Sequence, residues 1–360
     1  MVSRCFRLNH TLTQYLIIFG SLVLFFSFYY FDGPHHQQMK SAVVNAIDDW
    51  IKHEHNDTYE KSTTQSSPTT TAGDSESASS FHSTCSASAD RRGPHQNVIG
   101  YSMYGSNFSE PKFYNLYLKS FTETLKSIPI MYPGWVVRIY LELRSDDVES
   151  WKVFNKVLDL GTNSSRDHID LCNATQVIMN RKLGDIFEMT WRWLPLLDDM
   201  VDTLMSRDSD SVIITREQDA VAEWLASNKT FHLMRDNPHH CSFFLGGCWG
   251  VKISQQRAAI VATAEKMFGE NHSHKKGYDQ QLLNGFYKSM AVNSMVAHDS
   301  YCCEKFKGSQ PYPTPRQNGA FIGAAQHNPP IQPVLKVPCP ESCRPHNLTG
   351  PLALADWSFC

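Results

Sequence analysis

One segment near the N-terminus constrains the architecture of this chain more than any other: LTQYLIIFGSLVLFFSFYYF (12–31) contains no charged residue. Its residues, about twenty at roughly 1.5 Å each in a helix, reach about 30 Å, the thickness of the hydrocarbon core of a bilayer. A buried helix in a globular domain is the alternative, but so long an uncharged run argues against it. We therefore predict one transmembrane helix over 12–31, with the lipid bilayer as its partner.

The charges that flank this run indicate its orientation. Arg4 and Arg7 precede it and Asp32 follows it, so the positive-inside rule places residues 1–11 in the cytosol and the rest of the chain in the lumen. A cleavable signal peptide is the alternative, but it would end in small residues, whereas this run ends in FYYF (28–31). The pattern predicts a retained signal anchor in a single-pass type II protein of the Golgi or endoplasmic reticulum membrane.

Two residue patterns after the run fit a lumenal location. Asparagines in Asn-x-Ser/Thr sequons, the acceptors of N-glycosylation, recur along it: Asn56, Asn107, Asn163, Asn173, Asn228, Asn271 and Asn347. All but one of the ten cysteines follow the run, and an oxidising lumen favours disulfides, with one cysteine left over from the odd number. We expect Cys339, Cys343 and Cys360 to pair among themselves or with Cys302 or Cys303; a zinc site that uses Cys339 and Cys343 is the alternative.

Composition divides the lumenal part into three regions. Residues 32–96 include KSTTQSSPTTTAGDSESASSFHSTCSASAD (61–90), which has almost nothing to bury and predicts a disordered stem. A globular domain is expected over 97–330, followed by a Cys- and Pro-rich tail over 331–360. The formal net charge of −3 gives no sign of a nucleic-acid partner. Golgi-resident type II enzymes have this layout, but adhesive or shed proteins share it, so it does not determine the chemistry.

Within the domain, segments with strand patterns alternate with segments with helical patterns. Apolar runs predict strands at 97–105, 135–143, 168–179, 201–207, 231–236 and 241–253. Between them apolar residues recur at helical spacing, as at Phe113, Leu116, Tyr117 and Phe121. Such alternation predicts an α/β fold: a Rossmann-like, mixed, mainly parallel sheet with helices on both faces.

Asp208 and Asp210 stand one residue apart directly after the predicted strand 201–207. Two carboxylates this close repel each other unless water screens them or a cation lies between them. A solvated turn is the simpler interpretation. However, the carboxyl ends of strands are where open α/β sheets bind ligands, and hard divalent cations commonly bridge such carboxylates to phosphate oxygens.

The surroundings of this pair resemble a known family. WRWLPLL (191–197) precedes VDTLMSRDSDS (201–211), and FFLGGCWGVK (243–252) and YDQQLLNGF (278–286) follow. In this order and spacing the sequence resembles the GT-A glycosyltransferases, most closely the retaining family 8 type that includes glycogenin and bacterial galactosyltransferases. The resemblance covers roughly 97–306, and its specific block is 192–210.

The resemblance implies a set of binding residues. Asp208 and Asp210 would hold Mn²⁺ or Mg²⁺ against the diphosphate of a nucleotide sugar, with His298 as the candidate third metal ligand. Arg192 would reach the donor, and Gly246 and Gly247 would let the backbone approach the sugar or acceptor. Asp236, Asp279 and Gln280 are weak candidates for a catalytic role, and neither nucleophile nor base is assigned.

The implied function is a lumenal glycosyltransferase that uses a UDP- or GDP-sugar, a divalent metal and a glycan or glycoprotein acceptor. Two features keep an alternative open. Arg207 could form a salt bridge with the aspartate pair, and the Cys- and Pro-rich tail has no place in the resemblance. Separately, Arg235 could neutralise Asp236. The alternative function is a non-catalytic lumenal binding or adhesion protein on a glycosyltransferase-like scaffold.

Overall fold

The computed structural model describes residues 82–360 apart from 106, 143, 145, 163–164 and 326–333. The predicted anchor (12–31), most of the predicted stem, and the sequons at Asn56 and Asn163 lie outside this part. Within it, no helix combines the length and the apolar character needed to cross a membrane. The other predicted acceptor asparagines are all exposed: Asn107, Asn173, Asn228, Asn271 and Asn347.

An eight-stranded sheet forms the centre of the described fold, in the order β3-β2-β1-β4-β6-β5-β7-β8. Its strands are β1 (Gln96–Met103), β2 (Val136–Leu141), β3 (Ile169–Asn173), β4 (Val201–Arg207), β5 (Phe231–Arg235), β6 (Cys248–Lys252), β7 (Met295–Asp299) and β8 (Ser309–Gln310). Neighbouring strands run parallel, except that β6 is antiparallel to both β4 and β5. The predicted mixed, mainly parallel sheet is confirmed.

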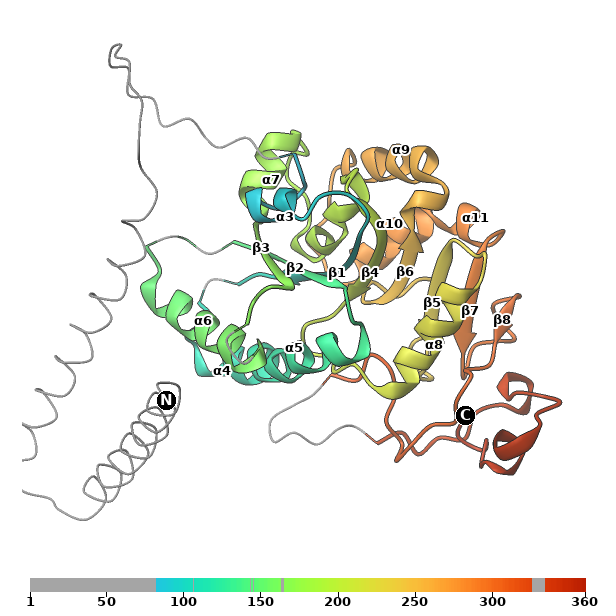
Figure 1. The fold of residues 1–360 in the computed structure, drawn as a ribbon. Helices are drawn as coiled ribbons and strands as arrows, with labels where there is room; N and C mark the ends of the chain where they lie inside the picture. The colour runs from blue at the N-terminus through green and yellow to red at the C-terminus, as the bar shows by residue number, and fades with distance from the viewer. Residues whose placement is uncertain (1–81, 106, 143, 145, 163–164, 326–333) are drawn as a thin grey trace, which may run out of the picture. The chain divides into compact units, whose positions relative to one another are not determined.

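Helices cover both faces of this sheet (Figure 1). On one face lie α3 (Ala87–Arg91), α7 (Ala174–Arg181), α9 (Arg257–Phe268), α10 (Tyr278–Phe286), α11 (Lys288–Ala291) and the 3-10 helix η2 (Glu188–Leu197). On the other lie α4 (Pro111–Phe113), the π-helix η1 (Tyr114–Leu118), α5 (Lys119–Met131), α6 (Val148–Thr162) and α8 (Thr215–Ala226). Short 3-10 helices η3 (Ile253–Gln255), η4 (Glu341–Cys343) and η5 (Gly350–Leu354) complete the described helices.

The two faces have separate hydrophobic cores because side chains alternate along each strand. In β4, Leu204 packs into the core beneath η2 and α9, whereas its neighbour Met205 packs into the core beneath α5 and α6. In β1, Val98 and Ile99 divide between the two cores in the same way. The predicted bounds of β4, 201–207, are correct, although only Val201, Leu204 and Met205 of its seven residues are apolar.

Two predicted strands are wrong in part. The segment 168–179 forms β3 only as far as Asn173, whose side chain then accepts a hydrogen bond from the backbone N–H of Gln176 and caps α7. The segment 241–253 forms β6 only from Cys248 onward, and the residues before it are a loop. An apolar run alone does not distinguish a strand from a buried helix or loop.

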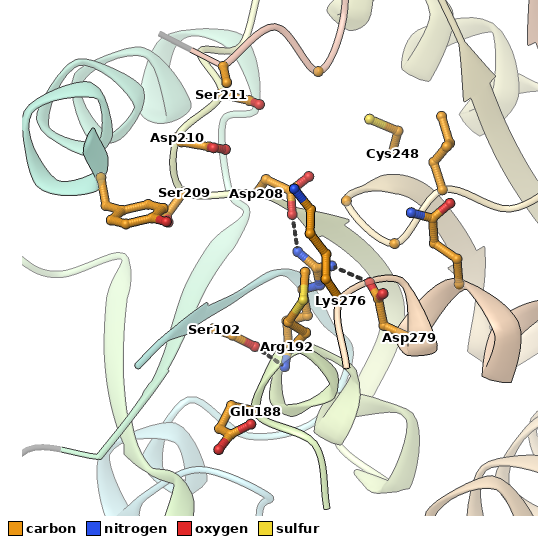
Figure 2. Close-up of a pocket in the computed structure, with 18 of the residues that line it drawn as sticks. Ser102, Glu188, Arg192, Asp208, Ser209, Asp210, Ser211, Cys248, Lys276 and Asp279 are labelled. Atoms are coloured by element: carbon orange, nitrogen blue, oxygen red, sulfur yellow. Dashed lines mark hydrogen bonds and ion pairs between the residues drawn. The ribbon is translucent and has the colours of Figure 1, made fainter. Parts of the chain in front are cut away.

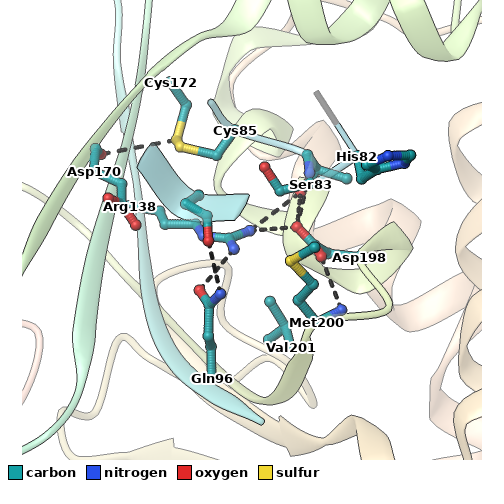
Figure 3. Close-up of polar contacts among 12 residues, drawn as sticks. His82, Ser83, Cys85, Gln96, Arg138, Asp170, Cys172, Asp198, Met200 and Val201 are labelled. Carbon is teal, nitrogen blue, oxygen red and sulfur yellow. Dashed lines mark hydrogen bonds and ion pairs between the residues drawn. A yellow bond between two sulfur atoms is a disulfide. The ribbon is translucent and has the colours of Figure 1, made fainter. Parts of the chain in front are cut away.

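The folded unit also begins earlier than the predicted boundary at residue 97. Cys85 forms a disulfide with Cys172, and the backbone N–H of Thr84 donates to the Asp198 carboxylate over 2.7 Å. Figure 3 shows this carboxylate meeting Arg138. Arg138 Nη1 lies 2.6 Å from Asp198 Oδ2, and neither side chain has exposed surface. Small polar residues made this segment look like stem, but here they form a buried hydrogen-bond network.

Three disulfides hold the C-terminal part together: Cys241–Cys302, Cys303–Cys343 and Cys339–Cys360. The predicted pairing of the tail cysteines is therefore confirmed. The zinc alternative is not supported, because Cys339 and Cys343 join different sulfur partners. Among the described cysteines Cys248 alone has no disulfide partner, and it is buried.

Candidate functional site

A cavity of about 950 Å³ opens at the carboxyl edge of the sheet (Figure 2). Residues at the end of β1, such as Ser102 and Tyr104, line it together with the loop after β4. β2 lies on the other side of β1, so the strand order reverses between β1 and β4. This is the topological switch point at which open α/β sheets bind ligands, and the cavity has the volume of a small-molecule site.

Asp208 and Asp210 both line this cavity. Asp208 follows the last residue of β4, and its side chain remains 38% exposed. The loop that carries Asp210 is fixed by a β-bridge between Ser211 and Ala325, so the C-terminal part of the chain contributes to the same wall. The structure therefore brings the two predicted carboxylates to one cavity.

Arg192 lies on η2, beneath the aspartate loop. Its backbone N–H donates to Ser102 Oγ over 3.0 Å, which ties η2 to the end of β1. Its guanidinium donates from Nη1 to Asp208 Oδ1 and from Nη2 to Asp279 Oδ2, the latter over 3.1 Å. Figure 2 shows the guanidinium between the two carboxylates, and its side chain is only 4% exposed. We call these three residues the Asp208–Arg192–Asp279 cluster.

Gly246 and Gly247 form the wall against which this cluster packs. A Cβ atom at Gly246 would lie 2.1 Å from Asp279 Oδ2, and one at Gly247 would lie 2.0 Å from Asp208 Oδ2. A side chain at either position would therefore displace the neighbouring carboxylate. Both positions need glycine for a steric reason, because the carboxylates approach the backbone, and neither has a positive φ.

Asp279 and Gln280, two of the three candidate catalytic residues, line the cavity from the first turn of α10. Asp279 is buried, and its Oδ1 atom has no hydrogen-bond partner in the structure. Burial raises the pKa of the Asp279 carboxyl, against the opposing effect of the nearby Arg192 guanidinium. A buried carboxylate with one unsatisfied oxygen needs an explanation, and its place at the cavity makes Asp279 a candidate ligand-binding residue.

The third candidate, Asp236, lies elsewhere. It is buried between Arg216 and Arg316 and is not among the residues that line the cavity. The prediction that Arg235 neutralises Asp236 was wrong, because Arg235 pairs with Asp299 over 2.6 Å. Saturation of its carboxylate by two arginines makes Asp236 a structural residue.

Arg207, which could have formed a salt bridge with Asp208 and Asp210, also pairs with a different carboxylate. Its guanidinium turns away from the aspartate pair and donates to Glu217 over 2.6 Å, with both side chains buried. It also donates to the backbone oxygen of Trp249. Arg207 therefore links β4, β6 and α8, and the arginine that reaches Asp208 is Arg192.

His298 is not brought to the aspartate pair. It is buried in β7, separated from β4 by β6 and β5, and does not line the cavity. Its imidazole faces Glu223 at 3.1 Å and His232 at 2.9 Å. Within the described part of the chain, no group of three or more His, Cys, Asp and Glu side chains could hold a metal ion.

Other residues line the cavity that the sequence analysis did not identify. They include Glu188, His239, His240, Cys248 and Lys276. Burial lowers the pKa of His240, and its Nδ1 atom is buried without a partner. Burial raises the pKa of the Cys248 thiol, so it stays protonated at neutral pH. His239 and His240 had one signal in the sequence: they end the segment HLMRDNPHH (232–240), which has no counterpart in the family that the chain resembles.

No protein-family model matches the chain, and no curated protein is similar to it in sequence. The functional assignment therefore depends on the residues of the cavity and their geometry.

Proposed function

We propose that the chain is a lumenal glycosyltransferase of the GT-A type, closest to the retaining family 8 enzymes. It would transfer a sugar from a UDP- or GDP-sugar to a glycan or glycoprotein acceptor. The observation that carries the proposal is the meeting of Asp208, Asp210 and a buried arginine, Arg192, at one cavity at the switch point of the sheet. The anchor at 12–31 would hold this domain on the lumenal side of a Golgi or endoplasmic reticulum membrane.

The donor set fits a hard divalent cation. Mg²⁺ and Mn²⁺ prefer oxygen ligands, and Mg²⁺ is commonly held by one or two carboxylates, water and substrate phosphates without a closed protein cage. Asp208 and Asp210 offer such oxygens on the cavity wall. When bound, the cation would offset negative charge on the departing diphosphate.

The chain's own residues supply further charge and orientation. Arg192 is buried and held by Ser102 and Asp279, so its charge acts in a region of low dielectric without reorganising. Gly246 and Gly247 let the Asp279 and Asp208 carboxylates lie close to the backbone. Asp279, at the cavity wall, is the candidate acceptor for a hydroxyl hydrogen of the bound sugar or acceptor.

A panel of UDP- and GDP-sugars tests the proposal, using the purified full-length chain and release of UDP or GDP as the signal. We expect one donor to be cleaved in the presence of Mn²⁺ or Mg²⁺, and the signal to disappear with a chelator. Asp208→Asn and Asp210→Asn should each abolish it, while Asp202→Asn, at the other end of β4, should not. If no donor reacts and no nucleoside diphosphate binds, the non-catalytic binding protein replaces this proposal.

A further inference from the structure

The Asp208–Arg192–Asp279 cluster is asymmetric. Its one guanidinium contacts two carboxylates, but the Asp208 side chain is 38% exposed whereas that of Asp279 is 2% exposed. A buried carboxylate that loses its cation is strongly destabilising, whereas an exposed one is readily solvated. Arg192 therefore has a permanent partner in Asp279 and an exchangeable partner in Asp208.

Arg192 and a divalent cation would compete for the same carboxylate. The guanidinium occupies Asp208 Oδ1, and a cation bound there would lie next to a second positive charge. The Asp208 carboxylate lies close against Gly247, where a Cβ atom would come within 2.0 Å of Oδ2, while 38% of the side chain remains exposed. A cation therefore reaches Asp208 from the cavity side.

The other half of the guanidinium limits how far Arg192 can move. Nη2 donates to Asp279 Oδ2 over 3.1 Å, and the backbone of Arg192 is tied to Ser102. Nη1 also donates to the backbone carbonyl of Arg207 over 3.4 Å. Loss of the contact with Asp208 therefore leaves the guanidinium held by Asp279 and Arg207, with one N–H group of Nη1 free for another acceptor. A diphosphate oxygen is a strong acceptor for such a donor.

We infer that Arg192 is a coupling switch, which yields Asp208 to a divalent cation and transfers the released N–H to a diphosphate. The inference depends on the proposed function, since it assumes that both ligands enter this cavity. Under this inference each ligand strengthens binding of the other. The diphosphate draws Arg192 from Asp208, so the cation binds more tightly. By linkage, the bound cation strengthens binding of the diphosphate by the same factor.

Calorimetric titration of the full-length chain with Mn²⁺ alone tests the competition. Arg192→Gln removes the competing charge, so Mn²⁺ should bind about fivefold or more tightly than to the wild type. Arg257→Gln is the matched control. Arg257 pairs with Asp202 at the opposite end of β4, so the same loss of net charge there should leave Mn²⁺ affinity unchanged.

Two further variants keep the test decisive if Arg192→Gln folds poorly. Asp279→Asn removes the permanent partner, so Arg192 should hold Asp208 more strongly and Mn²⁺ should bind more weakly. The double variant Arg192→Gln/Asp279→Asn leaves the net charge unchanged and buries no unpaired charge. It should bind Mn²⁺ more tightly than the wild type, as Arg192→Gln does.

Repeating the titrations with UDP or GDP present measures the coupling. The wild type should bind Mn²⁺ at least about fivefold more tightly with nucleotide than without it, and Arg192→Gln should reduce this ratio to the part that comes from direct contact between the cation and the diphosphate. The coupling switch is overturned, and the proposed function stands, if the wild type binds Mn²⁺ and nucleotide but Arg192→Gln fails to raise the Mn²⁺ affinity or Asp279→Asn fails to lower it. If the wild type binds neither ligand, both fail.

Discussion

β4 and β5, which follow one another along the chain, each end in an arginine that is followed by an aspartate, yet the two aspartates differ completely in environment. β4 ends at Arg207 followed by Asp208, and β5 ends at Arg235 followed by Asp236. In both cases the arginine is buried and pairs with a carboxylate from another element. The aspartates then diverge: one faces a cavity and the other is enclosed.

Asp236 is enclosed because distant parts of the chain converge on it. Arg216 and Arg316 each donate two hydrogen bonds to its carboxylate, and Ser300 and the backbone N–H of Ile322 add two more. Its side chain has no exposed surface. Asp208 instead meets one arginine and remains 38% exposed. Saturation by donors marks a structural carboxylate, and incomplete saturation at a cavity marks a binding carboxylate.

The largest expected difference is in stability. Asp236→Asn leaves two buried arginines without their counter-charge and should lower the free energy of unfolding by about 3–5 kcal/mol. Asp208→Asn should cost about 1 kcal/mol or less, because Arg192 keeps Asp279 and the site is partly solvated. Chemical denaturation of both variants measures this, and equal losses would remove the distinction between the two strand ends.

The enclosure of Asp236 should depend on the C-terminal disulfide. The backbone N–H of Arg316 donates to the carbonyl of Cys360, and its Nε donates to that of Phe359. The bridge Cys339–Cys360 spans 21 residues, so the double variant Cys339→Ser/Cys360→Ser should lose about 3 kcal/mol. An unchanged denaturation midpoint would show that the tail covers Asp236 without this bridge.

A smaller loss is expected at the wall behind Asp208. Gly247→Ala puts a methyl group where the Asp208 carboxylate lies, so it should cost about 1–3 kcal/mol and weaken Mn²⁺ binding. Gly285→Ala on α10 is the control: nothing lies within 4 Å of its Cβ position, so it should be neutral or stabilise the helix by up to about 1 kcal/mol. If Gly247→Ala were equally harmless, Asp208 would not be held against this wall.

The smallest effect is a difference in pH dependence, with opposite signs for the two environments. Burial raises the pKa of Asp279 above its usual 3.8, so the stability it contributes is full below that value and is lost as pH rises through the folded pKa. Burial alone would raise the pKa of Asp236 too, but Arg216 and Arg316 lower it overall, so its contribution is lost as pH falls.

Denaturation at pH 4 and pH 7 checks the sign for Asp279. The change in the free energy of unfolding caused by Asp279→Asn should be more stabilising, or less destabilising, at pH 7 than at pH 4. The two changes should differ by at most about 1.4 kcal/mol for each unit by which the pKa of Asp279 is raised. A difference that changes in the opposite direction would mean that Arg192 dominates over burial at this carboxyl.

The sequence predicts the framework of the fold better than its edges. The bounds of β4 are readable because the strand lies between the helix-like block WRWLPLL (191–197) and the polar turn that begins at Asp208. The loop before β6 is apolar for a different reason: Phe243 and Phe244 pack into the core from a loop, so periodicity misassigns it as strand. The segment from residue 82 looks like stem because Thr84 is stabilised by partners far along the chain.

The site was predictable only where local sequence carries the signal. Asp208, Asp210 and Arg192 are readable from one short block that runs into a strand end. The partners that decide the role of each carboxylate are not, because Arg316 lies 80 residues from Asp236 in the sequence and Asp279 lies 87 from Arg192. His298 fails as a candidate because its place in the strand order, three strands from β4, cannot be counted along the sequence.

The most direct test of the account is thermal unfolding of the full-length wild type and of Asp208→Asn, each with UDP or GDP and Mn²⁺. A ligand at about 100 times its Kd stabilises the folded state by about 2.7 kcal/mol. We predict that one nucleoside diphosphate raises the Tm of the wild type only with Mn²⁺ present, and that Asp208→Asn folds normally but shows no such rise. Equal rises for both proteins, or none for the wild type with either nucleotide, would contradict the claim that Asp208 is a metal-dependent ligand-binding carboxylate.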